Sequence, residues 1–323
     1  MQLYPLKFKA IPKTKIWGGN RLRNITNHNF NVDNIGETWD IAAFADTDTE
    51  ITNGFLAENT LSEILEVYMS DLIGDKLYSL YGNRFPLLVK LIDATDKLSV
   101  QVHPNDEIAQ KNGESNGKTE MWYVLDATDD AEIILGFNKD INKEELKEHI
   151  NTKTLTNILS RKQVKKGDIA FIPAGTIHAI GKGCTILEIQ QSSDTTYRLH
   201  DFDRLQSNGK PRELHIKEAL DAIDYAHWQH DIIHTNNINN NETIIDSDYF
   251  TCEIIKCTKD ITLDCSELDS FIILSVTNGS VDLLSGKNKT TLNFGESCLI
   301  PAALNSLELH PNKQTTLLKT FIK

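Results

Sequence analysis

The chain has 323 residues, of which 40% are hydrophobic and 24% are charged, and its formal net charge is −13. A typical domain has about 100–200 residues, so this length and globular composition predict two packed domains and exclude a disordered or fibrous protein. The acidic charge and the lack of Lys/Arg-rich runs argue against nucleic acid as a partner, and an anionic ligand would need a local cluster of Lys and Arg.

Three segments show helical periodicity. In the first, Leu61 to Leu72 places its apolar side chains on one face, with Asn59 or Thr60 available as the N-cap. The second runs from about Asn142 in NKEELKEHINTKTLTNIL, and the third is RELHIKEALDAI. We expect these to be helices added to a protein that is otherwise built from strands.

The other regular segments read as short strands. In chain order the first-half runs are FPLLVKLID, LSVQVH, MWYVL, AEIILGF, DIAFIP and CTILEIQ, and the second-half runs are YFTCEIIKC, SFIILSV and VDLLS. Gly, Asn and Asp turn signals separate them. Many short strands without regularly alternating helices favour a mainly β fold made of sandwiches or barrels.

An Asn-rich segment, HTNNINNNETIIDSD, loses the apolar pattern and is typical of a linker or exposed loop. We therefore predict a first domain over residues 1–233, a linker over 234–248 and a second domain over 249–323. KKGDIAFIPAGTIHAI in the first domain is similar to NFGESCLIPAALNSLEL in the second. Aligning the shared Ile-Pro-Ala puts Ser306 where His178 stands, so we expect the second copy to have no metal site.

Targeting signals are lacking in the sequence. The first fifteen residues have no long apolar core, and no apolar run reaches membrane-spanning length. The cysteines are odd in number and form no CxxC pair: Cys184, Cys252, Cys257, Cys265 and Cys298. We expect a cytoplasmic protein with reduced thiols, no membrane association and no obligate protein partner.

Polar side chains with metal-ligand chemistry cluster in the first domain. Gln101 and His103 are two residues apart on a predicted strand, so both point to one face with about 6.6 Å of rise between them. Glu120 on a neighbouring strand can supply a carboxylate oxygen. His178 closes a G-x5-P-x-G-x2-H segment whose Gly and Pro predict a turn between strands. We predict that these four residues hold one divalent metal.

The segment that ends at His178 resembles the second cupin motif. Gln101, His103 and Glu120 match the first cupin motif, with Gln in place of the more usual first His, and Lys182 stands where the second motif has its final Asn. The resemblance implies two cupin-like jelly-roll β domains, the second degenerate and without a metal.

A second resemblance rests on longer blocks that occur in order along the chain: KIWGG, IGETWDIA, FPLLVKLIDATDKLSVQVHPND, GKTEMWYVL, FIPAGTIHAI, QQSSDTTYRLHDFDR and RELHIKEAL. Through these blocks, nearly the whole chain resembles one family, the type I mannose-6-phosphate isomerases in their short bacterial form. The resemblance implies an aldose-ketose isomerase that interconverts mannose 6-phosphate and fructose 6-phosphate, with one Zn²⁺ per chain and a small-molecule sugar phosphate as its ligand. It also implies that Arg198 is the catalytic arginine and that Lys90, Ser99 and Lys118 line the substrate pocket.

The implied reaction moves a proton between adjacent carbons through an enediol or enediolate, which requires a base and positive charge near the developing oxyanion. Arg198 and the metal can supply the charge. Glu188 is our first candidate for the base, although strand alternation leaves its face undecided and a solvated surface carboxylate is an equal alternative. A metal-bound water, Lys118 or His200 are other candidates. We assign the segments around Trp17 and Gly36 to structural turns.

Two other classes of function stay open from the residues alone. The same ligands could hold iron or manganese in an oxygenase, because two histidines and a carboxylate do not select zinc. A sugar-phosphate binding protein without catalysis is the other alternative, and the intact ligand set with Arg198 argues against it.

Overall fold

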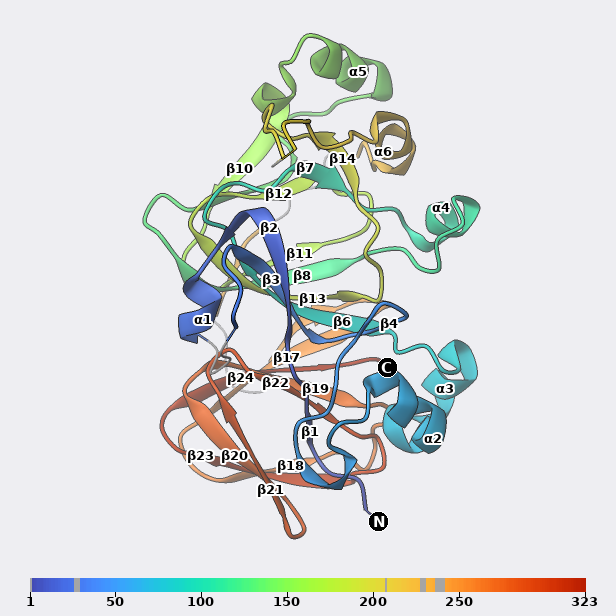
Figure 1. The fold of residues 1–323 in the computed structure, drawn as a ribbon, viewed down its shortest axis with the longest axis vertical. Helices are drawn as coiled ribbons and strands as arrows, with labels where there is room; N and C mark the ends of the chain where they lie inside the picture. Colours follow the sequence, from blue (N-terminus) through green and yellow to red (C-terminus); the bar gives the residue numbers. More distant parts are fainter. Residues whose placement is uncertain (1, 26–29, 207, 227–230, 236–241) are drawn as a thin grey trace.

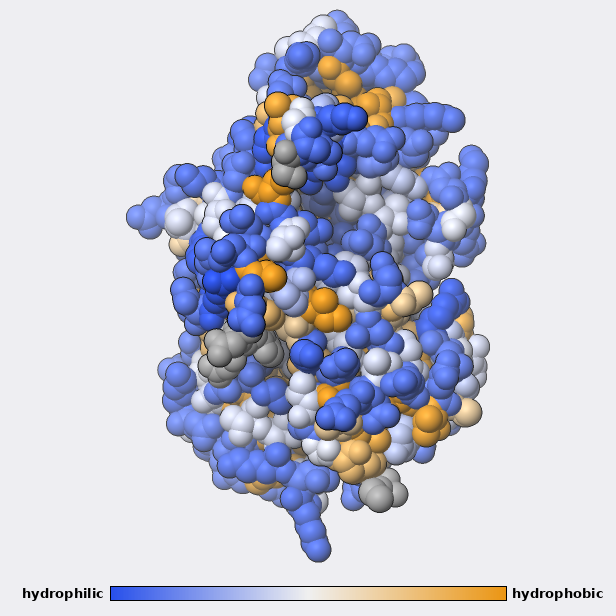
Figure 2. Space-filling view, in the orientation of Figure 1, coloured by the Kyte–Doolittle hydropathy of each residue, from blue (hydrophilic) through white to orange (hydrophobic). Residues whose placement is uncertain are grey.

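The computed structural model describes residues 2–25, 30–206, 208–226, 231–235 and 242–323. Within these ranges the strands form four large sheets, which follow one another along the long axis of the molecule (Figure 1). The sheets pair into two β sandwiches, so the predicted mainly β fold with two β units is confirmed. The face drawn in Figure 2 is mainly hydrophilic, and its hydrophobic residues lie in small separate groups.

The first sandwich contains a seven-stranded and a five-stranded antiparallel sheet. The seven-stranded sheet has the order β15 (Ile233–His234), β11 (Asp168–Ile172), β8 (Glu120–Ala127), β13 (Cys184–Gln191), β6 (Leu87–Asp93), β3 (Ile35–Ile41) and β2 (Ile11–Gly19). The five-stranded sheet has the order β10 (Leu159–Gln163), β9 (Glu132–Phe137), β12 (His178–Ile180), β7 (Val100–Val102) and β14 (Tyr197–His200). Side chains of both sheets, including Trp122, Ile133 and Ile186, pack into the core between them.

The second sandwich contains a six-stranded and a four-stranded sheet. The six-stranded sheet has the order β1 (Leu6–Lys7), β22 (Ser297–Ile300), β19 (Ile272–Asn278), β24 (Thr315–Phe321), β17 (Thr251–Cys257) and β16 (Glu242–Asp246). The four-stranded sheet has the order β18 (Ile261–Asp264), β23 (Ser306–Pro311), β20 (Ser280–Ser285) and β21 (Asn288–Asn293). Apolar side chains, among them Leu274, Leu283 and Leu307, fill this interior.

The three predicted helices are present. Helix α2 (Leu61–Ile73) begins at Thr60, whose side chain forms a capping box with Glu63. Helix α5 (Lys143–Asn151) begins at Asn142 in the same way but ends at Asn151, before the predicted stretch does, because Lys153 has a positive φ of 58°. Helix α6 (Ile216–Ala222) is the third. Helices α5 and α6, with the 3-10 turn η2 (Leu155–Ile158), pack on the outer face of the five-stranded sheet (Figure 1).

Shorter elements complete the chain. They are α1 (Arg21–Ile25), α3 (Asp75–Tyr81), α4 (Asp106–Lys111), the 3-10 turn η1 (Gly54–Leu56) and the ribbon of β4 (Ala43–Phe44) with β5 (Thr47–Asp48). Among the described residues, no helix is long and apolar enough to cross a membrane. All five cysteines are buried free thiols.

The repeated segments of the two halves adopt the same strand-turn-strand arrangement. Strands β11 and β12 flank the first Ile-Pro-Ala, and β22 and β23 flank the second. His178 is the first residue of β12, and Ser306 is the first residue of β23. The serine therefore has the structural position of the histidine, which supports a second copy without a metal-binding side chain.

The division of the chain at 234–248 stays a prediction. Of this range, residues 236–241 lie outside the described residues, His234 ends β15 and strand β16 pairs with β17. At the other end of the chain, Leu6 and Lys7 of β1 pair with β22 in the second sandwich.

The two sandwiches share one hydrophobic core between the seven-stranded and six-stranded sheets. Phe85 packs on Phe271 with ring centroids 4.8 Å apart, and Phe171 meets Phe250 at 6.3 Å. Phe85 and Phe271 are fully buried. The interface is apolar and continuous, so we expect the two halves to stabilise each other.

Phe271→Ala tests this coupling. Removing a buried phenyl ring leaves a cavity and typically costs about 3–5 kcal/mol, so we expect the free energy of unfolding to fall by that amount. Urea unfolding followed by circular dichroism measures it, with Val67→Ala as the control because Val67 is 70% exposed. A loss below about 1 kcal/mol in the Phe271 variant would contradict a shared core.

Candidate active site

Two histidines and a glutamate converge inside the first sandwich. His103 directly follows β7, Glu120 is the first residue of β8, and His178 is the first residue of β12. One ligand atom from each lies within 4.8 Å of the others, and all three side chains are buried. Strands β7 and β12 are neighbours in the five-stranded sheet and Glu120 comes from the facing sheet, so the three donors meet across the sandwich.

Backbone carbonyls fix the orientation of both imidazoles. His103 donates from Nδ1 to the Thr195 carbonyl at 2.8 Å, and His178 donates from Nδ1 to the Thr176 carbonyl at 2.9 Å. Since a carbonyl only accepts, each Nδ1 carries the proton and each neutral ring keeps a lone pair on Nε2. Each Nε2 lies 3.4 Å from an oxygen of Glu120. This is the pattern of metal-binding histidines, whose second nitrogen is held by a carbonyl.

The imidazoles are neutral because they are buried. Burial, followed by the charge of Lys118, lowers the pKa of His103 to about 3, and burial also lowers the pKa of His178. Burial alone would raise the pKa of Glu120, but chiefly the charge of Lys118 holds it well below its usual range. The cluster therefore presents two neutral nitrogen donors and one carboxylate.

The environment of the Glu120 carboxylate indicates that the cluster is suited to bind a cation. It is completely buried, and neither of its oxygens accepts a hydrogen bond from a described residue. Lys118 Nζ lies 3.0 Å from one carboxylate oxygen and 3.0 Å from His103 Nε2, which leaves the other oxygen and His178 Nε2 without a cation. A buried carboxylate with unsatisfied oxygens is costly, and a divalent cation between these donors would remove that cost.

Gln101 is the fourth residue predicted for this cluster. It pairs with His178 across the β7–β12 ladder, and its Nε2 lies 3.2 Å from His178 Nε2. A half-turn of the amide would replace this nitrogen by Oε1, which is the atom that could bind a metal. The structure thus places Gln101 at the edge of the cluster, with its amide nitrogen toward His178.

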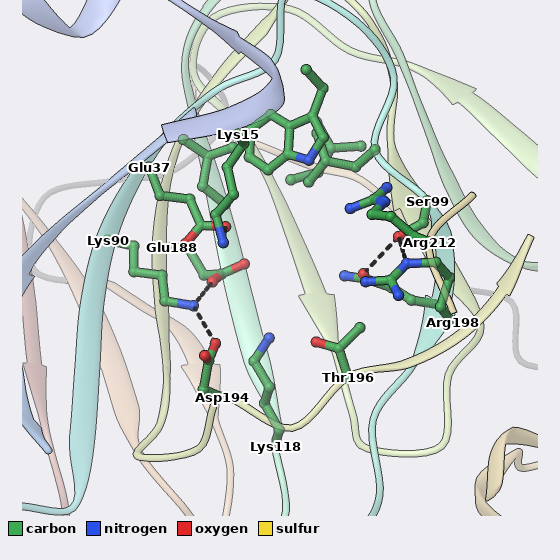
Figure 3. Close-up of a pocket in the computed structure, with 15 residues that line it drawn as sticks. Lys15, Glu37, Lys90, Ser99, Lys118, Glu188, Asp194, Thr196, Arg198 and Arg212 are labelled. Atoms are coloured by element: carbon green, nitrogen blue, oxygen red, sulfur yellow. Dashed lines mark hydrogen bonds and ion pairs between the residues drawn. The ribbon is translucent and has the colours of Figure 1, made fainter. Parts of the chain in front are cut away.

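A pocket opens beside the cluster and has Gln101 and Lys118 in its wall. Figure 3 shows Lys15, Glu37, Lys90 and Glu188 on one side, and Ser99, Arg198 and Arg212 on the other. The remaining residues that line it are Trp17, Ile92, Leu98, Ile180, Asp194 and Thr196. His103, Glu120 and His178 lie behind Gln101 and Lys118, which contact them.

One side of the pocket carries alternating charges on four neighbouring strands. In the order β13, β6, β3 and β2 the residues are Glu188, Lys90, Glu37 and Lys15. Lys90 Nζ lies 3.6 Å from Glu188 and 3.9 Å from Asp194, and Lys15 Nζ lies 3.2 Å from Glu37. Lys90 and Glu188 are only 3% exposed, so water does not screen their ion pair.

The pKa values of the two carboxylates in this row are shifted in opposite directions. Burial would raise the pKa of Glu37, but Lys90 and Lys15 lower it to about 2. Burial, and next the charge of Glu120, raise the pKa of Glu188. Glu188 also accepts a hydrogen bond from Trp122 Nε1 at 2.8 Å, which fixes its orientation toward the pocket. Its face is thereby decided: Glu188 lines the pocket and is no surface carboxylate.

The opposite side of the pocket is formed by strand β14 and the segment that follows it. Arg198 lies across from Gln101 in the β14–β7 ladder. Its Nε donates to Ser99 Oγ at 3.3 Å and its Nη1 to the Glu213 carbonyl at 2.8 Å. Arg212 is bound through Nε to Asp201 Oδ2 at 2.7 Å. Two guanidinium groups therefore share one wall.

A loop between β13 and β14 connects the pocket with the cluster. Gln190 donates from Nε2 to the carbonyls of Ser193 at 2.6 Å and Gln191 at 2.8 Å. The same loop presents Asp194 to Lys90 and the Thr195 carbonyl to His103. The loop thus helps to hold both the lysine of the pocket and one imidazole of the cluster.

The residues that the sequence predicts for the site lie in the pocket or in the cluster beside it, except for His200. Lys90, Ser99, Lys118, Glu188 and Arg198 line the pocket, whereas His200 is not among its lining residues.

Sequence reasoning missed Lys15, Glu37, Asp194 and Arg212 as pocket residues. Lys15 and Glu37 lie in the segments assigned to structural turns, and Trp17 of the first segment also lines the pocket. The one available signal was their position inside the KIWGG, IGETWDIA, QQSSDTTYRLHDFDR and RELHIKEAL blocks.

The β sandwich with two imidazoles and a carboxylate converging inside it defines the class: a cupin-type protein with a candidate metal centre. Residues 6–155 match the family model for the phosphomannose isomerase type I catalytic domain, and residues 240–317 match the mannose-6-phosphate isomerase cupin domain. The chain belongs to the type I mannose-6-phosphate isomerase family. The predicted family, cupin fold and isomerase class are thereby confirmed.

Individual relatives cover almost the entire chain. The mannose-6-phosphate isomerase ManA of Bacillus subtilis is 39% identical over 314 residues, 96% of either chain. The mannose-6-phosphate isomerase of Streptococcus mutans is 35% identical over 304 residues, 94% of either chain. The crystal structure of the Bacillus subtilis mannose 6-phosphate isomerase superimposes with a TM-score of 0.88 at 34% identity and covers 98% of this chain and 99% of that one.

Proposed function

We propose that the protein interconverts mannose 6-phosphate and fructose 6-phosphate through an enediol or enediolate, with one zinc ion per chain. The observation that carries the proposal is the buried cluster of two neutral imidazoles and one carboxylate, next to a pocket lined by Glu188 and by lysines and arginines. The family and its relatives supply the substrate. The five free thiols support a reducing compartment, so we further propose the cytoplasm.

His103, Glu120 and His178 would hold the metal, with Gln101 as the fourth ligand after its amide turns. Nitrogen and carboxylate oxygen donors in this number suit zinc. When bound, the ion would supply a positive charge that stabilises negative charge on the substrate oxygens. Ser306 at the equivalent position of the second sandwich supports one metal for each chain.

Glu188 is the proposed base that moves the proton between the two carbons. A general base works best when its pKa lies closer to the working pH than that of an exposed carboxyl, and burial raises the pKa of Glu188 in that direction. Lys90 and Trp122 hold its two oxygens in place. Lys118 is the alternative proton carrier in the pocket, and its Nζ lies 3.0 Å from an oxygen of Glu120.

Arg198 is proposed to stabilise the oxyanion that develops when the proton leaves carbon. A guanidinium stays charged at any working pH and offers planar paired donors. The contacts with Ser99 and the Glu213 carbonyl hold it in the pocket without neutralising its charge. Preorganised charge of this kind needs no rearrangement during the reaction.

Glu188→Gln tests the base. We expect kcat to fall by about 10²–10⁴-fold, because an amide cannot accept the proton, while the metal content and KM change little. Steady-state kinetics and metal analysis measure these quantities. Glu132→Gln is the control, since Glu132 pairs with Arg161 outside the pocket. A Glu188 variant with at least half of the wild-type kcat would assign the proton transfer to another group.

The overall function is tested with an assay that couples fructose 6-phosphate formation to a reporter enzyme, before and after treatment with a chelator. We expect turnover that is lost with the metal, returns with zinc, and accompanies about one zinc per chain. Binding of mannose 6-phosphate without turnover would instead indicate a binding protein. Iron or manganese with oxygen consumption would indicate an oxygenase.

A further inference from the structure

We propose that the protein has a second binding site, for an uncharged hexose, in a cavity between helices α3 and α4 at the junction of the two sandwiches. The cavity has a volume of about 270 Å³ and shares no lining residue with the candidate active-site pocket. Its residues come from both sandwiches and from the two helices, which lie at the right-hand edge of Figure 1. The inference does not depend on the isomerase function proposed above.

Two tyrosine rings form part of the cavity wall. Tyr81 is the last residue of α3, and Tyr249 precedes β17 in the second sandwich. Both rings are partly buried and pack on the core that the sandwiches share. A phenol in this position offers an apolar ring and a polar hydroxyl group. A sugar ring, which has C–H groups on its faces and hydroxyl groups around its edge, matches both.

The two phenols are uncharged hydrogen-bonding groups. Burial, and next the charge of Asp106, raise the pKa of Tyr249 to about 12, and the same causes raise the pKa of Tyr81. A protonated phenol both donates and accepts a hydrogen bond, as a sugar hydroxyl does. The phenols can therefore bind sugar hydroxyl groups in either direction.

Planar polar side chains complete the wall. Arg84, Gln110 and Asn116 contribute a guanidinium and two amide groups. Asn116 donates from Nδ2 to the Ser192 carbonyl at 2.9 Å, and Arg84 donates from Nε to the Tyr81 carbonyl at 3.5 Å. Within the described ranges, the Nη atoms of Arg84 and the Gln110 amide make no hydrogen bond to the protein. These donors and acceptors suit the adjacent hydroxyl groups of a sugar.

The charges in this cavity cancel. Arg84 and Asp106 are its charged lining residues, one positive and one negative. The candidate active-site pocket is instead lined by five basic and three acidic side chains. An anionic ligand therefore meets an excess of positive charge in that pocket but not in this cavity, and we infer an uncharged ligand here.

Hydrogen bonds fix two of the lining residues. Gln191 is buried, accepts a hydrogen bond from the Thr119 amide nitrogen at 2.8 Å and donates to Asp106 Oδ1 at 3.1 Å. The same oxygen of Asp106 accepts a hydrogen bond from the Gly117 amide nitrogen at 2.7 Å. This side of the cavity is therefore preformed, which lowers the cost of binding a small ligand.

Isothermal titration calorimetry of the zinc-loaded protein with methyl α-D-mannopyranoside and methyl α-D-glucopyranoside tests the site. Both probes are uncharged hexoses whose rings cannot open, so neither is a substrate for isomerisation. We expect saturable binding of at least one of them with a Kd of about 1 mM, as for an uncharged ligand of this size.

Arg84→Ala is expected to weaken this binding at least about 10-fold and Gln110→Ala about 2- to 10-fold, because they remove a charged and a neutral hydrogen-bonding group. Both side chains are exposed, so the variants should fold. Glu107→Gln is the matched control, since Glu107 lies on α4 but does not line the cavity.

Arg198→Ala separates this site from the candidate active-site pocket. We expect that variant to bind the pyranoside with the wild-type Kd, and we expect Arg84→Ala to keep the wild-type kcat in the coupled assay. The absence of saturable binding, or a Kd that Arg84→Ala and Gln110→Ala both leave unchanged, would overturn the inference. Neither result would affect the proposed isomerase function.

Discussion

Replacing His103 or His178 by alanine is expected to yield a protein that retains no stoichiometric metal and has no measurable isomerase activity. Each imidazole presents one Nε2 lone pair to the cluster and is oriented by a carbonyl behind it, and no described histidine other than these two lies near Glu120. With three or fewer donors left, one of them the weakly binding Gln101 amide, a divalent ion would be lost during dialysis. Metal analysis by mass spectrometry and the coupled assay measure both effects.

The fold must be checked separately, because either substitution leaves Glu120 buried with fewer compensating groups. We expect a loss of about 1–3 kcal/mol in unfolding free energy, which leaves the variants folded at 25 °C. His149→Ala is the matched control, since its imidazole lies in the last turn of α5 and hydrogen-bonds the side chain of Thr154. Full metal occupancy in both folded variants would reject the cluster as the metal centre.

Arg198→Ala is expected to keep the metal and the fold but to lower kcat by at least about 10²–10³-fold. The magnitude is that of removing one preorganised donor to a developing oxyanion, and a charged group is worth more. The side chain does not contact His103, Glu120 or His178 in any described hydrogen bond or ion pair, so metal content should be unchanged. Steady-state kinetics with metal analysis on the same samples tests both statements.

Arg198→Lys sharpens the result. A lysine keeps the charge but cannot bind Ser99 and the Glu213 carbonyl with a planar group, so we expect only partial recovery of kcat. Arg161→Ala serves as the control for the loss of a surface guanidinium. If Arg198→Ala turned over at nearly the wild-type rate, the oxyanion would have to be stabilised by other groups.

Local sequence patterns were sufficient for several features. The capping boxes at Thr60 and Asn142 each join the N-cap residue to a glutamate three positions later. The structure has both helices beginning where the sequence predicts them. The Gly and Pro residues before His178 form a turn between β11 and β12, and His178 is the first residue of β12. Such features depend on a few neighbouring residues, so chain order alone specifies them.

Glu188 shows where local pattern fails. Every residue of β13 is buried, because the strand lies in the middle of a sheet that is covered on both faces by hydrophobic cores. A strand of this kind has no polar and apolar alternation from which to read the inward face. Only the pairing with β6 and β8, which places Glu188 beside Lys90 and Trp122, shows that it faces the pocket.

Short motifs and long matching blocks in the sequence were enough to predict the fold class, the family and the residues of the candidate metal cluster. The tertiary structure decided what surrounds them. Lys15 and Arg212 are almost 200 residues apart in the chain. They line one pocket because β2 and β14 belong to facing sheets and Arg212 lies in the segment that follows β14. Long-range strand pairing, which no local pattern encodes, therefore determines which charges face the substrate and which face one another.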